Sequence, residues 1–188
     1  MGLACTRPDP NSVITFPQKV LLLGPSGAVF FWYSGKTSLL YGWKLGCDAL
    51  VKPIPTDGFN VEQIKYHGQM YIVWDLSGVP NYRPRWRQFY HGTNVLVIVL
   101  DINSEEGWTF MKTDIYNILQ ERDLNKIPCI VVFNKSDLSG KEIDMIKETN
   151  RIQALPNINI VSCCAKDDDS TTAVLDLIHK VCHNLNSE

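Results

Sequence analysis

A glycine-rich segment near the start of the chain has the parts of a phosphate-binding loop, but its spacing is unusual. Gly24-Pro25-Ser26-Gly27-Ala28 follows the apolar run Val20–Leu23, and Gly35-Lys36-Thr37-Ser38 opens a predicted helix, Lys36–Leu45. Ten residues separate Gly24 from Gly35, whereas a Gly-x-x-x-x-Gly-Lys-Thr loop has four there. In such a loop, backbone N–H groups at a helix N-terminus bind phosphate oxygens, while a lysine and a hydroxyl serve the phosphates and Mg²⁺.

Four shorter polar segments follow in a fixed order. They are Pro55-Thr56, Asp75-Leu76-Ser77-Gly78, Asn134-Lys135-Ser136-Asp137 and Cys164-Ala165-Lys166. Asn-Lys-x-Asp alone is a common loop tetrapeptide, and Asp-x-x-Gly alone carries little information. Their value lies in the order, and in the apolar runs that precede Asp75 and Asn134.

The elements that position these segments alternate between strand and helix patterns. The patterns predict strands at Val20–Leu23, Val61–Tyr66, Met70–Asp75, Val95–Leu100, Ile130–Phe133 and Ile158–Val161. They predict helices at Lys36–Leu45, Glu105–Glu121 (with Ser104 as N-cap), Ile143–Ile152 and Thr172–Leu185. Such alternation is typical of an α/β domain with a mostly parallel sheet.

Bulk composition is that of an ordinary soluble domain. The chain has 188 residues, 45% of them hydrophobic, and a formal net charge of -2. No basic excess indicates nucleic-acid binding. No apolar run approaches the roughly 20 residues of a membrane span, and no signal-peptide pattern is present, so we expect a cytoplasmic protein. Six cysteines form no Cys-x-x-Cys pair, and all but Cys5 are expected to be free thiols.

The motif order is that of small GTPases, and longer tracts are more specific. Ile54–Glu62, Val73-Trp74-Asp75 and Arg83-Pro84-Arg85-Trp86-Arg87 resemble ADP-ribosylation-factor-like (Arf-like) GTPases. The resemblance implies a P-loop, Ras-like domain over residues 18–188, with a mostly parallel six-stranded sheet flanked by helices, after a flexible segment 1–17. It also implies a guanine-nucleotide switch in membrane traffic or signalling that uses GTP/GDP and Mg²⁺.

The same resemblance implies a role for each matching residue. Thr37 and Thr56 would ligate Mg²⁺, Asp75 would hold the metal site from its second shell, and Asn134 and Asp137 would read guanine beside the Lys135 stem. Phe59, Trp74 and Phe89 match an aromatic cluster that binds effectors. The full GTP-binding set is Gly24, Pro25, Ser26, Gly27, Ala28, Gly35, Lys36, Thr37, Ser38, Thr56, Gly78, Asn134, Lys135, Asp137, Cys164, Ala165 and Lys166.

Three substitutions depart from the family pattern. Val79 stands where the family has the glutamine that orients the attacking water, so we expect weak GTP hydrolysis and assign no catalytic residue. Ser77 replaces a glycine, which puts in doubt how easily the Val61–Asp75 hairpin slides when GTP binds. Asp57 places a negative charge beside Thr56, where the family prefers an apolar residue.

The six extra loop residues admit several interpretations. Removing either Val29–Ser34 or Ala28–Tyr33 restores the standard loop, so the boundary is ambiguous. In the first interpretation, the extra residues are a splice or gene-model product. In the second, they disable nucleotide binding, and the protein is a nucleotide-free scaffold that retains the fold. In the third interpretation they form an aromatic finger for a partner or lipid, while the loop still holds phosphate.

The first residues fit a lipidation signal. Met1-Gly2-Leu3-Ala4-Cys5-Thr6 matches the pattern for myristoylation at Gly2. One acyl chain gives only marginal membrane binding, and stable anchoring takes a second signal. Cys5 is therefore a candidate for palmitoylation. The alternative is a tail without lipid. With lipid, the protein would lie peripherally on the cytosolic face of a membrane, while its exchange factors and activating proteins stay unidentified.

Overall fold

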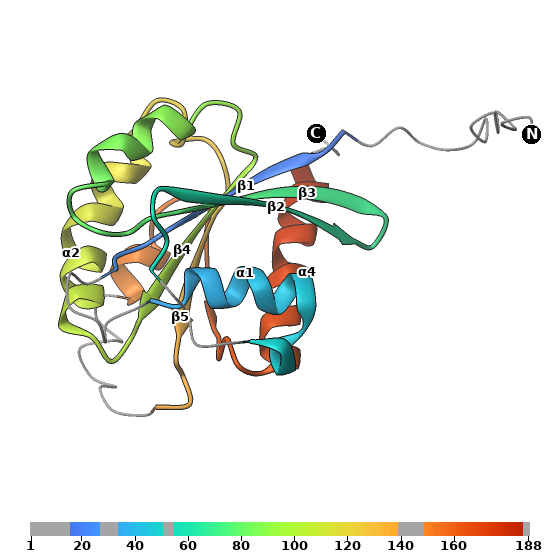
Figure 1. Cartoon of the computed structure of the whole chain (residues 1–188). Helices are drawn as coiled ribbons and strands as arrows, with labels where there is room; N and C mark the ends of the chain where they lie inside the picture. The colour runs from blue at the N-terminus through green and yellow to red at the C-terminus, as the bar shows by residue number, and fades with distance from the viewer. Residues whose placement is uncertain (1–15, 27–33, 51–54, 139–148, 186–188) are drawn as a thin grey trace, which may run out of the picture.

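Six strands form a single sheet with the order β2-β3-β1-β4-β5-β6 (Figure 1). The computed structural model describes residues 16–26, 34–50, 55–138 and 149–185. The strands are β1 Gln18–Leu23, β2 Phe59–Tyr66, β3 Gln69–Leu76, β4 Val95–Asp101, β5 Cys129–Asn134 and β6 Ile158–Ser162. The helices are α1 Lys36–Leu45, α2 Glu105–Leu119 and α4 Asp168–Leu185, with short 3₁₀ helices η1 Cys47–Ala49 and η2 Arg83–Phe89.

Among the described strands, every pairing is parallel except that of the β2–β3 hairpin. β1 lies between β3 and β4, with Leu22 opposite Asp75 on one side and Val97 on the other. The hairpin turns at His67 and Gly68, both with positive φ. The sequence-based prediction of a mostly parallel six-stranded sheet is therefore confirmed.

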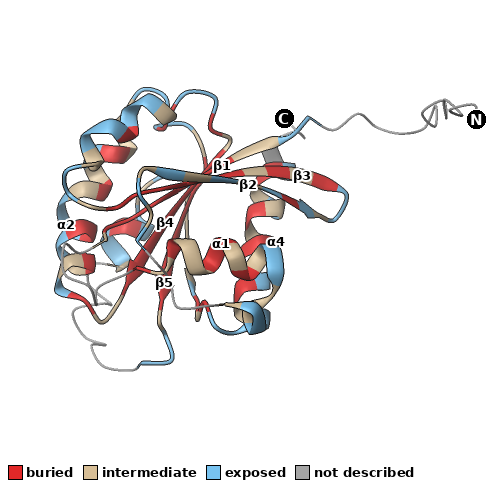
Figure 2. Ribbon diagram, viewed as in Figure 1, coloured by how far each residue is buried: buried red, intermediate tan, exposed pale blue. Residues whose placement is uncertain are grey.

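Along the inner strands, alternate side chains belong to two separate apolar clusters. Val20 and Leu22 of β1 face α1 and α4, whereas Leu21 and Leu23 face α2 and η2. All seven residues of β4 are buried, as expected for a strand covered on both faces. Figure 2 shows these buried strands at the centre of the molecule. A sheet supported on both faces is a rigid base for the loops at its edge.

The predicted helix bounds agree with the described helices except at two ends, since α2 ends at Leu119 rather than Glu121 and the last helix begins earlier than predicted. Ser104 caps α2, because its hydroxyl accepts from the Gly107 N–H at 2.9 Å. The last helix begins at Asp168, four positions before the predicted Thr172. Most of the predicted helix 143–152 lies outside the described residues, although residues 149–153 are helical. Among the described residues, no helix combines the length and apolar character needed to cross a membrane.

Candidate functional site

The predicted motifs meet at one edge of the sheet. Because β3, β1, β4 and β5 are parallel, their carboxyl ends lie together, and these ends carry Asp75, Gly24, Asp101 and Asn134. Open α/β sheets bind ligands at such an edge, beside the strand where the chain order reverses. A small hollow, partly open to solvent, lies here, and its lining includes Lys36, Thr37, Ser38 and Thr56.

Lys36 joins the two ends of the lengthened loop. Its buried ammonium group donates to the Gly24 carbonyl at 2.9 Å, to the Pro25 carbonyl at 3.5 Å and to Ser34 Oγ at 3.2 Å. The Lys36 ammonium group therefore contacts both ends of the loop. The predicted site residues Gly27 and Ala28, and most of the insertion, lie outside the described residues.

Asn134 fixes the second half of the same loop. Its Nδ2 donates to the Ser34 carbonyl at 2.8 Å, and its Oδ1 accepts from the Ala165 N–H at 3.0 Å. A Cβ on Gly35, whose φ is +91°, would lie 2.0 Å from Nδ2, so a side chain there would clash. Ser34, directly before Gly35, therefore contacts both Lys36 and Asn134.

Three oxygen-bearing side chains converge beside the first turn of α1. The Thr37 hydroxyl donates to Asp75 Oδ2 at 2.6 Å and lies 2.9 Å from the Thr56 hydroxyl. Thr56 and Asn60 also reach Asp75 Oδ2, at 3.4 and 3.3 Å. Asp75 is fully buried, and its Oδ1 has no hydrogen-bond partner among the described residues.

This cluster fits a hard divalent cation. Hydroxyl and carboxylate oxygens are ligands that Mg²⁺ accepts, and a buried carboxylate oxygen without a partner is costly unless a cation or donor joins it. Burial raises the pKa of Asp75, while the nearby Lys36 charge opposes that shift. Thr37, Thr56 and Asp75 are therefore the residues that would hold Mg²⁺, which would neutralise phosphate charge there.

Burial also shifts the protonation equilibrium of the Lys36 amine. Desolvation lowers its pKa from 10.5 to about 8, although Asp75 acts in the opposite direction. The sequence alone gave no sign of this shift, because it depends on how deeply the loop encloses the ammonium group. A phosphate beside Lys36 would favour the charged form.

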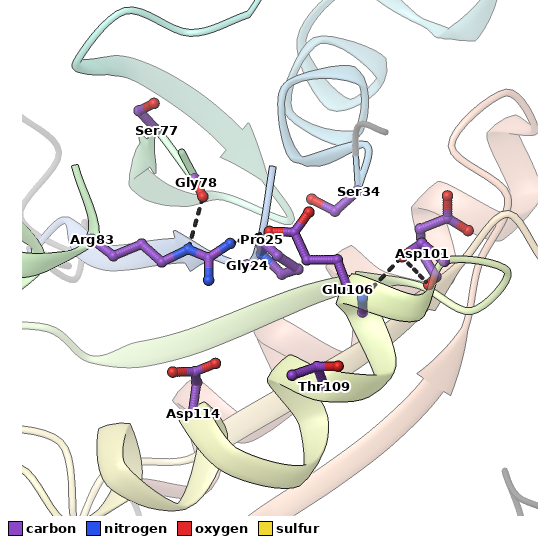
Figure 3. Close-up of polar contacts among 12 residues, drawn as sticks. Gly24, Pro25, Ser34, Ser77, Gly78, Arg83, Asp101, Glu106, Thr109 and Asp114 are labelled. Atoms are coloured by element: carbon purple, nitrogen blue, oxygen red, sulfur yellow. Dashed lines mark hydrogen bonds and ion pairs between the residues drawn. The ribbon is translucent and has the colours of Figure 1, made fainter. Parts of the chain in front are cut away.

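The Gly78 segment lies directly against the loop (Figure 3). The Gly78 carbonyl accepts from the Ser26 N–H at 3.0 Å and from Arg83 Nε at 2.9 Å. Arg83 also forms an ion pair with Glu106 of α2. A Cβ on Gly78 would lie 2.2 Å from the Gly24 carbonyl oxygen, so only glycine fits this approach. Arg83 lies in the tract that resembles Arf-like GTPases, but no sequence pattern indicates its contact with Gly78.

Ser77 takes the glycine position without a left-handed backbone. It is absent from the described non-glycine residues that have positive φ, which are His67, Lys135 and Asn157. Ser77 is buried, its N–H donates to the Gly58 carbonyl at 2.8 Å, and its carbonyl accepts from Trp86 Nε1 at 2.9 Å. In this state of the hairpin, serine is accommodated.

The predicted base-reading residues lie in two neighbouring loops. The Ser136 N–H donates to the Cys163 carbonyl at 3.2 Å, which joins the loops after β5 and β6. Asp137 and Lys166 are exposed, while the Cys164 N–H donates to Ser170 Oγ at 2.8 Å. The N–H of Ala165, a member of the predicted GTP-binding set, donates to Asn134 Oδ1 in this structure.

Known proteins resemble this chain in sequence and in fold. The model of the ADP-ribosylation factor family matches residues 18–182. The chain belongs to the ADP-ribosylation factor family. ADP-ribosylation factors J and K of Dictyostelium discoideum are each 38% identical to this Arf-family chain over 122 residues, which is 65% of this chain and 61% of each relative. ADP-ribosylation factor-like protein 1 of Caenorhabditis elegans is 36% identical over the same length, 63% of that protein. The chain spans about three fifths of the length of these relatives.

A solved structure agrees on the fold. The Arl6 (BBS3) small GTPase of Trypanosoma brucei, with the bound nucleotide analogue GppNp, matches with a TM-score of 0.75. The match covers 90% of this chain and 99% of that one at 16% identity. The Ras-like small GTPase fold predicted from the sequence is therefore confirmed. None of these comparisons favours the nucleotide-free scaffold.

The aromatic residues singled out in the sequence do form a cluster in this Arf-family chain. The Phe59 ring lies 5.5 Å from the Trp74 ring and 5.2 Å from the Phe89 ring, and the latter two are 5.7 Å apart. Phe59 is 45% exposed although it is large and apolar. Lys19 supports the cluster, because its ammonium group donates to the Phe89 carbonyl and lies 5.4 Å from the Trp74 ring centroid.

Proposed function

We propose that this chain is a guanine-nucleotide-binding switch of the Arf-like type that binds GTP and GDP with Mg²⁺. The observation that carries the proposal is the convergence of Lys36, Thr37, Thr56 and Asp75 beside the first turn of α1. A buried ammonium group and an unpartnered carboxylate oxygen next to a helix N-terminus suit a magnesium–phosphate pair.

The residues of the site fall into three groups with different roles. Lys36 and the loop N–H groups bind the phosphates, and Thr37 and Thr56 hold Mg²⁺ with Asp75 behind them. Lys135 and Asp137 face the base, with guanine preferred because a carboxylate accepts from its ring N–H and exocyclic amine. Asn134 positions the loops, since both polar atoms of its amide are engaged within the protein.

Hydrolysis by this switch is expected to be slow. Val79 occupies the position of the water-orienting glutamine and has no hydrogen-bonding group in its side chain. The switch would therefore persist in its GTP form unless another protein supplies the missing group.

The lengthened loop is compatible with phosphate binding. Lys36 and Asn134 hold both ends of the loop in place, so extra residues between Ser26 and Ser34 need not separate Gly24 from Gly35. This favours an added loop on a working switch over a disabled site. The interpretation as a splice or gene-model product stays open, because it concerns the origin of the segment.

The switch would act on effectors near a membrane. The exposed Phe59, with Trp74 and Phe89, offers an apolar surface on the β2–β3 hairpin that follows Thr56. Lipid at Gly2, with Cys5 as a second signal, would place the domain 18–188 on the cytosolic face of a membrane. Both residues lie outside the described part of the chain, and intact-mass analysis of protein from eukaryotic cells tests the modification.

Calorimetric titration tests the nucleotide assignment. After bound nucleotide is removed with a chelator, the full chain is titrated with GTP and with ATP, each with and without Mg²⁺. We expect GTP to bind at least tenfold more tightly with Mg²⁺, and Asp75→Asn to lose most of that gain. Asp123→Asn, a carboxylate far from the loop that pairs with Arg122, is the matched control. Equal binding of ATP and GTP would contradict guanine specificity.

A further inference from the structure

We propose that Asp101 is a positioning residue that sets guanine-nucleotide affinity through Lys135. This inference rests on the proposed function, because it concerns the lysine that would line the base. Asp101 drew no attention in the sequence, where it only ends the apolar run Val95–Leu100.

Asp101 and Lys135 form the best-buried ion pair among the described residues that does not involve the phosphate loop. Lys135 Nζ lies 2.6 Å from Asp101 Oδ2, and the two side chains are 30% and 7% exposed. Asp101 is the last residue of β4 and stands opposite Asn134 in the β4–β5 register. The sheet itself therefore places the carboxylate next to the base-reading loop.

Asn103 completes the arrangement from the other side. Its N–H donates to Asp101 Oδ1 at 2.9 Å, so both carboxylate oxygens are used. Its Nδ2 donates to the Lys135 carbonyl at 3.2 Å, and Lys135 itself has a φ of +61°. A non-glycine residue in this left-handed region is held there by its surroundings. Both the backbone and the ammonium group of Lys135 are thus fixed before any ligand binds.

The same loop is anchored to α2. Ser104 Oγ donates to the Asp101 carbonyl at 3.1 Å and caps the helix, and Trp108 Nε1 donates to the Ile102 carbonyl at 2.9 Å. Figure 3 shows Asp101 beside the start of this helix. The carboxylate therefore belongs to a rigid support, against which the Lys135 side chain is held.

Fixing a lysine in advance has a measurable consequence. A free lysine side chain must lose rotamer entropy when its stem packs against a base, and Asp101 removes that cost before binding. Without the carboxylate, we expect guanine-nucleotide affinity to fall about tenfold, which is about 1.4 kcal/mol. Because mutations at one binding site change dissociation rates more than association rates, the loss should appear mainly as faster dissociation.

A double-mutant cycle tests whether Asp101 acts through Lys135. The variants are Asp101→Asn, Lys135→Met and the double variant, each measured for GDP affinity and dissociation rate by fluorescent-nucleotide displacement. Asparagine keeps an acceptor for the Asn103 N–H and removes only the charge. Glu62→Gln, which breaks the exposed Lys44–Glu62 ion pair between α1 and β2, is the matched control and should bind like the wild type.

The expected result is non-additivity. Asp101→Asn should weaken binding about tenfold, and the double variant should bind no worse than Lys135→Met. Asp101→Glu, which keeps the charge, should retain most of the affinity and serves if the asparagine variant does not fold. Wild-type affinity in Asp101→Asn, or losses that simply add, would overturn the proposal while leaving the switch intact. A wild-type chain that binds no guanine nucleotide would instead overturn the proposed function, and this inference with it.

Discussion

Nucleotide affinity should fall with rising pH because of Lys36. Burial lowers the pKa of this amine to about 8 in the free protein, and phosphate binding requires its charged form. Near pH 7 about nine-tenths of the free protein carries the charge, and near pH 9 about one-tenth does. The apparent affinity for GDP should therefore fall about tenfold across this range, at about 1.4 kcal/mol per pH unit above the pKa.

The sign follows from the direction of the shift. A lysine whose pKa is lowered in the free protein must take up a proton when the phosphate binds, so binding weakens as protons become scarce. A phosphate group beside the amine restores its pKa, so the bound complex stays charged across the same range. The nucleotide phosphates are already ionised above pH 7, and they add little to the pH dependence.

The assay is GDP affinity at constant ionic strength and saturating Mg²⁺ from about pH 7 to about pH 9. Lys36→Arg is the control, because a guanidinium stays charged throughout, so its pH dependence reports only the nucleotide and the remaining protein. A constant affinity of the wild-type chain, or an equal fall in Lys36→Arg, would refute the reasoning.

Three further outcomes are expected. Val79→Gln should raise the rate of GTP hydrolysis measured by phosphate release, and an unchanged rate would show that glutamine is not what is missing. Gly78→Ala should destabilise the nucleotide-free protein by about 1–3 kcal/mol, because its Cβ would lie 2.2 Å from the Gly24 carbonyl oxygen; an unchanged Tm would contradict this. Burial and the neighbouring His183 lower the pKa of His179, so the folded state binds this proton less readily than the unfolded state. The Tm should therefore fall as pH drops below about 6.5, less steeply in His179→Gln, and identical slopes would exclude His179 as a cause.

Local signals predicted the parts of the fold that local chemistry controls. The helix Lys36–Leu45 was predicted with its observed bounds, because Gly35 and Gly46, both with positive φ, mark its two ends. Ser104 was recognised as a cap because a hydroxyl before a helix accepts from an N–H three residues on. Parallel strands then bring their carboxyl ends together, so the motifs that follow them share one edge of the sheet.

Local sequence signals could not predict the long-range contacts. The 3₁₀ helix Arg83–Phe89 has no periodic pattern, and it is held by the bond from Trp86 Nε1 to the Ser77 carbonyl. The pairing of Asp101 with Lys135 joins residues 34 positions apart, through a strand register that no single segment encodes. The engagement of the Ala165 N–H by Asn134 is of the same kind.

The most direct test is GTP binding with and without the extra loop residues. The full chain and a variant lacking Ala28–Tyr33, which keeps Ser34 beside Gly35, are titrated calorimetrically with GTP and Mg²⁺. We expect both to bind, because Lys36 and Asn134 hold both ends of the loop in the full chain. Binding by the shortened variant alone, or by neither, would contradict the view that this chain is a working guanine-nucleotide switch.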